Sequence, residues 1–180
     1  MKKLLVLLMM CFSFQSQALF EIRAGYGSNT LDEDAYLTSE FGKLKGFNLD
    51  AIIEPPLITD LGFGLRYETM EMELKGLGAD VEMDRLSLLI NYRVIDFLAY
   101  LGFIGTYALT NDMKYVAGSF SEDLDDKATY TIGVEGGVNL ALFSLGVEVG
   151  KMFGEARQSS NGGTIELDGL YFKGILGIGF

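Results

Sequence analysis

The sequence has no histidine and no tryptophan, and only one cysteine and two prolines among its 180 residues. Without histidine, a serine or water nucleophile lacks the base that most often activates it near neutral pH. A zinc or copper site would have to consist of carboxylates alone, and carboxylates suit hard ions instead. We therefore expect that the protein is not an enzyme and that it has no cofactor.

Long hydrophobic runs are missing outside the first 20 residues, MKKLLVLLMMCFSFQSQALF. In this leader two lysines precede an apolar run over residues 4–14, and the small residues Ser16 and Ala18 follow. Such an order is typical of a secretory signal peptide. The run is too short for a transmembrane helix, which needs about 20 apolar residues. Residues 1–18 are therefore predicted to be a signal peptide, and no later stretch could cross a bilayer as a helix.

Thiols and basic residues are scarce in what remains. The only cysteine, Cys11, lies in the leader, so the mature chain, predicted to begin at Leu19, has no disulfide. Two of the 14 basic residues also lie there, which leaves 12 basic against 25 acidic residues and a net charge of −13. A chain this acidic is not expected to bind nucleic acid. By its length, the segment 19–180 is predicted to form one domain.

Alternation of apolar with polar or small residues is abundant. Counting back from the end, Phe180, Ile178 and Leu176 alternate with glycines and Ile175. This period of two is typical of a β-strand with one apolar face. In the segment 97–109 both faces are apolar, so periodicity does not orient it. The pattern predicts eight strands, at residues 19–27, 44–54, 61–72, 84–94, 97–109, 128–140, 143–153 and from about Asp168 to the end.

The connections between these segments are alternately long and short. The short ones follow the second, fourth and sixth strands, and the long ones follow the first, third, fifth and seventh. An up-and-down antiparallel barrel would collect all long connections at one end and both termini at the other, as bacterial outer-membrane barrels do. The fold expected is all-β: an eight-stranded antiparallel up-and-down transmembrane β-barrel.

Alternation alone also fits a secreted soluble barrel with its apolar face inward. Three features favour the opposite orientation. The apolar face is nearly free of charge and is too bulky for an eight-stranded interior. The other face is rich in glycine, which would weaken a strand facing water but leaves room in a narrow lumen. That face also has five charges of each sign, as a confined lumen requires. The expected lumen charges are Glu21, Arg23, Asp50, Arg66, Glu68, Arg85, Arg93, Glu135, Glu148 and Lys173.

The terminal alternation ending on Phe180 resembles the closing strand of outer-membrane proteins, which the barrel assembly machinery recognises. The segment 19–180 as a whole resembles the small eight-stranded outer-membrane barrels of the OmpA/OmpX type. This resemblance implies an assembly signal made of Phe172, Leu176, Ile178 and Phe180. Because the sequence stops at Phe180, the peptidoglycan-binding domain of full-length OmpA is not expected. An aromatic girdle without tryptophan would use tyrosines such as Tyr26, Tyr67, Tyr92, Tyr107 and Tyr130.

Within the last strand, Lys173 is expected to point into the lumen toward a carboxylate of a neighbouring strand. Phe180 is expected at the inner membrane boundary, where an aromatic ring is well placed.

Two acidic runs fall in the long connections and are expected on the outer surface. A solvated surface is one interpretation, and weak calcium or magnesium binding, with bridging to lipopolysaccharide phosphates, is the other. The residues concerned are Asp32, Glu33, Asp34, Glu122, Asp123, Asp125 and Asp126.

The predicted function is non-enzymatic: envelope structure, and surface interaction through acidic extracellular loops, by a monomer in the outer membrane of a Gram-negative-type cell. Its partners would be outer-membrane lipid and lipopolysaccharide, the barrel assembly machinery and a surface partner that the sequence does not identify. One alternative is a narrow, porin-like pore for ions or small solutes, and a second is a secreted soluble ligand-binding β-barrel.

Overall fold

The computed structural model describes residues 19–31, 43–55, 60–74, 79–117, 120–126, 128–158 and 164–180. In these ranges the regular structure is entirely β. The strands are β1 (Phe20–Leu31), β2 (Leu44–Ile53), β3 (Leu61–Leu74), β4 (Ala79–Asp96), β5 (Ala99–Ala117), β6 (Phe120–Asp126), β7 (Tyr130–Leu140), β8 (Phe143–Phe153), β9 (Glu155–Gln158), β10 (Thr164–Glu166) and β11 (Gly169–Gly179). The predicted signal peptide lies outside the described residues.

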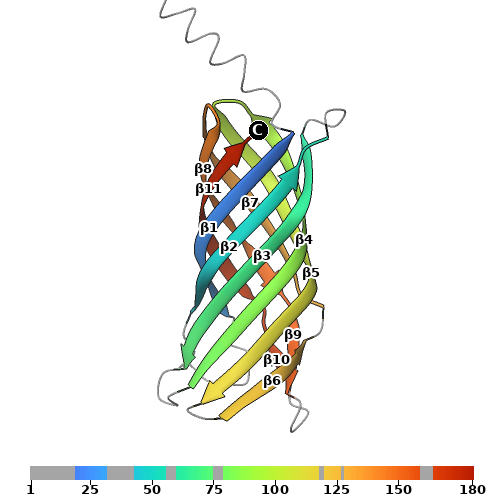
Figure 1. The fold of residues 1–180 in the computed structure, drawn as a ribbon, viewed down its shortest axis with the longest axis vertical. Coiled ribbons are helices and arrows are strands. Elements are labelled where there is room, and N and C mark those ends of the chain that lie inside the picture. Colours follow the sequence, from blue (N-terminus) through green and yellow to red (C-terminus); the bar gives the residue numbers. More distant parts are fainter. Residues whose placement is uncertain are drawn as a thin grey trace, which may run out of the picture.

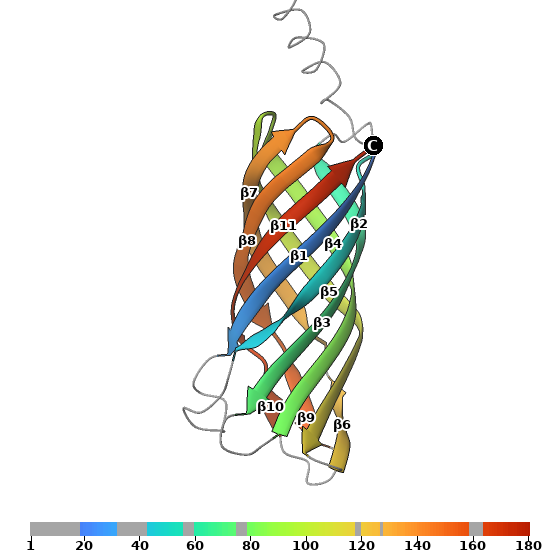
Figure 2. The ribbon, with the colours of Figure 1, turned by 60° about the vertical axis from the view of Figure 1, so that its left-hand side comes forward.

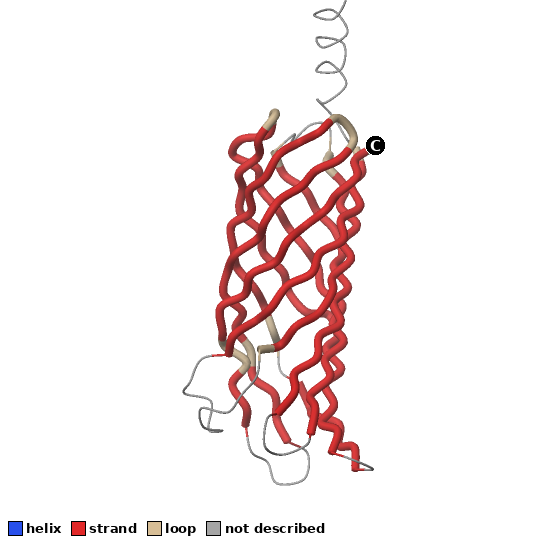
Figure 3. The backbone as a smooth tube through the Cα atoms, turned by 90° about the vertical axis from the view of Figure 1, so that its left-hand side faces the viewer, coloured by secondary structure: helices blue, strands red, loops and turns tan. Residues whose placement is uncertain are grey.

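Eight of these strands close into a barrel. In order around the wall they are β1, β2, β3, β4, β5, β7, β8 and β11, every neighbouring pair is antiparallel, and β11 returns to β1. Figures 1 and 2 show the tilted wall, with the C-terminus at the end that holds the short connections. The smooth tube of Figure 3 shows that strand makes up almost the whole described chain. The predicted fold is therefore confirmed.

Side chains alternate between the inside and the outside of the barrel along every spanning strand. In β2 burial alternates residue by residue over all ten positions, with Phe47 64% and Leu49 54% exposed and Asp50 fully buried. A contiguous exterior of large apolar side chains would be insoluble in water and matches a hydrocarbon environment. This surface rules out the soluble barrel, whose apolar face would point inward.

β5 has an orientation that the sequence pattern did not set. Tyr100, Ile104 and Thr106 are buried inside the barrel, whereas Leu101 and Phe103 are more than half exposed on its outside. Thr106 is joined to Thr131 of β7 by a hydroxyl–hydroxyl hydrogen bond of 2.6 Å. This hydrogen bond satisfies two hydroxyl groups that are buried on the inner face.

Three short strands form where connections were expected. β5 continues to Ala117 and pairs with β6, β6 pairs with β9, and β9 pairs with β10. Figure 1 shows them at the end of the barrel opposite the C-terminus. Beyond the hydrocarbon region a strand needs no apolar outer face, so these segments lack the alternation that marks the spanning strands. The connections after the fifth and seventh predicted strands are long, as expected, but they contain additional short strands that the sequence pattern did not predict.

Glycines on the inner face leave room for two tyrosines that fill the lumen. A Cβ atom at Gly146 or Gly137 would collide with Tyr100, and one at Gly133 or Gly150 would collide with the hydroxyl group of Tyr171. Removing side chains from these wall positions lets large rings cross a narrow interior, as expected from the glycine-rich face.

Candidate functional site

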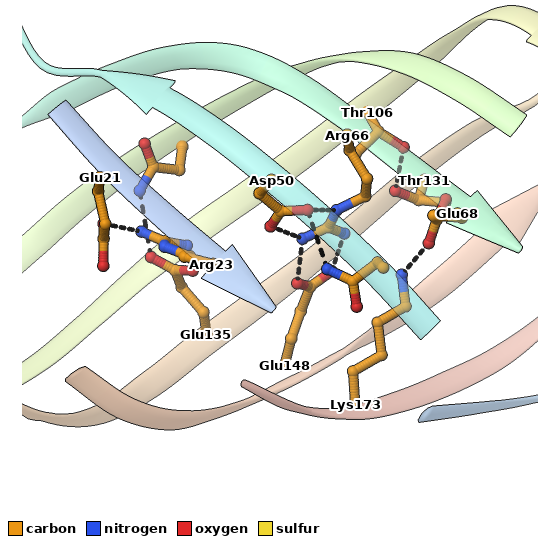
Figure 4. Close-up of polar contacts among 12 residues, drawn as sticks. Glu21, Arg23, Asp50, Arg66, Glu68, Thr106, Thr131, Glu135, Glu148 and Lys173 are labelled. Carbon is orange, nitrogen blue, oxygen red and sulfur yellow. Dashed lines mark hydrogen bonds and ion pairs between the residues drawn. The ribbon is translucent and has the colours of Figure 1, made fainter. Parts of the chain in front are cut away.

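The lumen holds a network of charged side chains that are supplied by seven of the eight barrel strands. The structure places all ten of the charges expected there inside the barrel, and none is more than 7% exposed. They form three groups along the barrel, and Figure 4 shows members of each. The ten residues are Glu21, Arg23, Asp50, Arg66, Glu68, Arg85, Arg93, Glu135, Glu148 and Lys173.

The first group lies at the end with the short connections and joins β1, β4 and β7. Arg23 donates to Glu135 at 2.6 Å and to Glu21 at 2.8 Å. Arg93 donates to the same Glu21 oxygen at 2.8 Å and approaches Glu135 at 3.4 Å. The Ser144 hydroxyl donates to the other Glu21 oxygen at 2.9 Å. Two cations therefore neutralise two carboxylates, as buried charges require.

The second group is centred on Arg66 of β3. Its guanidinium donates two hydrogen bonds to Asp50 of β2, at 2.8 and 2.7 Å, and two to Glu148 of β8, at 2.8 and 2.7 Å. β3 and β8 stand four places apart in the ring of eight strands, so they lie on opposite sides of the lumen. Both contacts are bidentate, which is the geometry in which arginine binds carboxylates most strongly. This arginine therefore spans the interior.

The third group surrounds Glu68 of β3, nearer the end with the long connections. Arg85 of β4 donates to it through Nε at 2.8 Å and also through Nη2, and Lys173 of β11 forms an ion pair with its other oxygen. Lys173 was expected to point toward a carboxylate of a neighbouring strand, and Glu148 of β8 does face it directly in the strand register. The ion pair itself, however, is with Glu68 of β3, which does not border β11. The long lysine side chain reaches across the lumen instead, over the space that the glycines leave.

Between this network and the long connections the lumen contains a cluster of apolar side chains, with the buried Asn29 in contact with it. Arg85 Nη1 donates to the Met152 sulfur at 3.2 Å, so the charged and apolar parts are in direct contact. Met70, Met83 and Met113 occupy one row of cross-strand partners on β3, β4 and β5. The whole cluster is Leu44, Met70, Met72, Val81, Met83, Met113, Met152 and Leu167.

Sequence reasoning missed the uncharged polar partners of the network. Asn48 donates to Asp50 at 2.9 Å, and Asn91 donates to Glu135 at 3.2 Å. Both asparagines lie on the same strand face as the charges, so the parity that selected the charges could have found them.

The acidic runs lie elsewhere. Asp32, Glu33 and Asp34 are outside the described residues. Glu122, Asp123, Asp125 and Asp126 were expected in a loop but belong to β6, where Asp123 faces Lys114 and Asp125 faces Arg157 in the strand register. Pairing of β6 with the extended β5 and with β9 explains the strand. Among the described residues no group of three or more acidic side chains is arranged to hold a metal ion, and no helix is long and apolar enough to cross a membrane.

The proposed assembly residues point outward from the last strand. Phe172, Leu176 and Phe180 are each more than half exposed, and Ile178 is partly exposed. The backbone N–H of Phe180 donates to the carbonyl of Phe20 at 2.9 Å, so the last residue is held against the first strand.

A closed eight-stranded barrel with an apolar exterior and a charged, packed interior is the architecture of small outer-membrane β-barrels, such as those of the OmpA/OmpX type. The outer membrane is thus the location of this chain, as predicted. Its surface is also consistent with the expected tyrosine girdle: Tyr26, Tyr67, Tyr92, Tyr107 and Tyr130 all point outward.

One of the solved structures that this chain resembles, Neisserial surface protein A, supports the same fold. Neisserial surface protein A matches with a TM-score of 0.65 at 14% identity, over 89% of this chain and 97% of that chain. Ail, the attachment invasion locus protein of Yersinia pestis, matches with a TM-score of 0.47 at 17% identity, over 89% of this chain and 95% of that chain. No family model and no curated protein sequence matches this chain.

Proposed function

We propose that this protein is a closed, non-enzymatic outer-membrane barrel that contributes to envelope structure and presents an acidic surface for interaction outside the cell. The predicted signal peptide 1–18 would direct export. The terminal strand would be the part that the barrel assembly machinery binds, and the barrel would act as a monomer.

The observation that carries the closed state is the double bidentate contact of Arg66 with Asp50 and Glu148. An ion crossing the lumen would have to break hydrogen bonds on both sides of a fully buried guanidinium. Removing one partner of such a contact is costly because the remaining charges stay buried without compensation.

A second barrier lies between Arg66 and the end with the long connections. The methionine-rich cluster at the end with the long connections is at most 7% exposed and has no charged member. An ion entering from outside would lose most of its hydration there and would meet mainly apolar side chains, with Asn29 beside Met152 as a buried polar group. The two barriers together favour a structural barrel over the narrow pore.

The proposed surface role rests on the ends of β3 and β4 that lie toward the long connections. Outward-facing positions of β3 and β4 change from apolar side chains to Glu71, Glu73, Asp80 and Glu82 toward the end with the long connections. Such a field would attract cationic groups and repel anionic ones. An enzymatic role finds no support, because the lumen carboxylates are committed to ion pairs and the chain has no histidine.

The test of the closed state is single-channel recording in planar bilayers with the refolded full-length mature protein. Wild type should show no stable conductance. Arg66→Ala should produce openings, because it removes the only bridge described between Asp50 and Glu148, and Tyr67→Phe on the lipid face should stay silent. Steady wild-type conductance that survives repurification would favour the pore instead. A gel shift between unheated and heated samples would verify that each variant is folded.

A further inference from the structure

The outer wall of the barrel has a groove across β1, β2, β3 and β4 on the side of the long connections. Its volume is about 940 Å³. On one side its lining includes Lys43 and Lys45, both exposed. Tyr26 and Phe47 line the same side, nearer the middle of the barrel. These four side chains point away from the lumen, and Met72, at the floor of the groove, belongs to the apolar cluster inside the barrel.

The aromatic pair marks where the apolar belt ends. The rings of Tyr26 and Phe47 lie 4.8 Å apart, and toward the other end of β2 the outward residues include Leu49 and Ile53, each more than half exposed. Lys45 is the next outward position beyond Phe47. Aromatic side chains of outer-membrane barrels occupy the interface between hydrocarbon and headgroups. The two lysines therefore stand at the level of lipid headgroups.

The opposite side of the groove carries four carboxylates. Glu71 faces Glu82, and Glu73 faces Asp80, as direct cross-strand partners on β3 and β4. All four are exposed and line the groove. Like charges that face each other directly destabilise a sheet, so a positive group placed between them would be favourable.

Charge is thus divided across the groove by strand. The lysines are on or next to β2, the carboxylates are on β3 and β4, and Lys45 faces Glu71 where the two sides meet. A purely anionic ligand would be repelled by the four carboxylates, and a purely cationic one would leave the two lysines without a partner. The arrangement fits a ligand that carries both signs a few ångströms apart, with an apolar part that can lie along Phe47.

We propose that this groove binds the headgroup of an outer-leaflet lipid of the phosphoethanolamine class, which carries a phosphate and a primary ammonium group. The phosphate contacts Lys43 and Lys45, the ammonium group contacts the paired carboxylates, and an acyl chain follows the apolar surface of β2. This site rests on the outer-membrane placement of the barrel and goes beyond the proposed function, since it does not depend on whether the lumen conducts.

The test uses the full-length mature barrel folded in an uncharged sugar detergent with EDTA present, and native mass spectrometry to count bound lipid. The probes are short-chain phosphatidylethanolamine, phosphatidylglycerol and phosphatidylcholine, with O-phosphoethanolamine as the headgroup alone. Phosphatidylethanolamine should bind most tightly, because only it combines the phosphate with three N–H donors. Lys43→Ala with Lys45→Ala, and separately Glu71→Gln with Glu73→Gln, should each weaken it by about tenfold, as expected for two partly exposed charge contacts.

Matched controls remove the same groups elsewhere on the wall: Lys151→Ala on β8 and Asp112→Asn on β5 should leave binding unchanged. Each variant is checked for folding by its mobility on unheated gels. Equal binding of phosphatidylglycerol, insensitivity to the carboxylate variants or a requirement for Mg²⁺ would overturn the proposal. Equal affinity for O-phosphoethanolamine would overturn its lipid component.

Discussion

Lys173 of β11 forms an ion pair with Glu68 of β3, although two strands of the wall separate β11 from β3. Glu68 also accepts a hydrogen bond from Arg85 of β4, so one carboxylate joins three strands. We predict that Lys173→Met destabilises the folded barrel by up to about 3 kcal/mol, because it removes one partner of a buried charge contact. Urea unfolding in lipid vesicles measures this. In a double-mutant cycle with Glu68→Gln the two losses should be strongly non-additive, and additive losses would contradict the pairing.

Leu176 of β11 should tolerate alanine much better than arginine. Leu176 is 57% exposed on the lipid side, so Leu176→Arg should cost about 2–4 kcal/mol if it lies near the midplane of the bilayer. Leu176→Ala should cost much less, because it introduces no charge into lipid. The free energies of unfolding of the two variants are compared in lipid vesicles. Equal losses of stability would argue that Leu176 does not face hydrocarbon.

Glycine 177 should behave differently from Gly174, three residues earlier on the same strand. A Cβ atom at Gly177 would meet the Ser144 hydroxyl and lie 2.7 Å from Glu21 Oε1, whereas one at Gly174 would meet nothing within 4 Å. We predict that Gly177→Ala destabilises the barrel and that Ser144→Ala partly restores stability in the double variant. Gly174→Ala serves as the matched control and should be nearly neutral.

Deleting Phe180 should reduce assembly in cells more than it reduces stability. Its ring is 61% exposed and contributes little packing, while its backbone is paired with Phe20. The measurements are the amount of heat-modifiable barrel in outer-membrane fractions and the refolding yield in detergent. Normal assembly of the deletion in cells would mean that Phe180 is not part of the assembly signal.

Glu54, just after β2 at the end with the short connections, should titrate near neutral pH. Burial raises its pKa to about 7, against the attraction of Arg93, whose Nη1 lies 3.5 Å away. Because the folded state holds this proton more tightly than the unfolded state, its contribution to stability is present below about pH 4.5 and is lost as pH rises through 7. Carbon-13 NMR of the carboxyl group measures the pKa. Glu54→Gln should remove this part of the pH dependence, and an unchanged profile would contradict it.

Much of the fold could be predicted because a membrane imposes strict alternation. Every spanning strand must present apolar side chains to lipid, so the parity of β2 or β11 is visible in the sequence. The same parity placed all ten charges on the inner face. It could not predict β6, β9 and β10, which lie beyond the hydrocarbon and follow no such constraint.

The pairing within the lumen was also beyond reach of the sequence. Parity says that Lys173 points inward, but the strand tilt and the room left by glycines decide which carboxylate it meets. The same holds for Arg66, whose second carboxylate belongs to the opposite wall. Partners of this kind depend on three-dimensional distance across the barrel and have no counterpart in local spacing.

The length of β4, 18 residues, has a consequence for how the surface is presented. A strand of that length measures about 60 Å, and at a tilt near 40° it rises about 45 Å, whereas the apolar band of such barrels is about 25 Å tall. Roughly 20 Å of hydrogen-bonded sheet therefore stands clear of the hydrocarbon. These strands are already ordered in the folded barrel. A partner that binds them would therefore lose little free energy to further ordering of the strands.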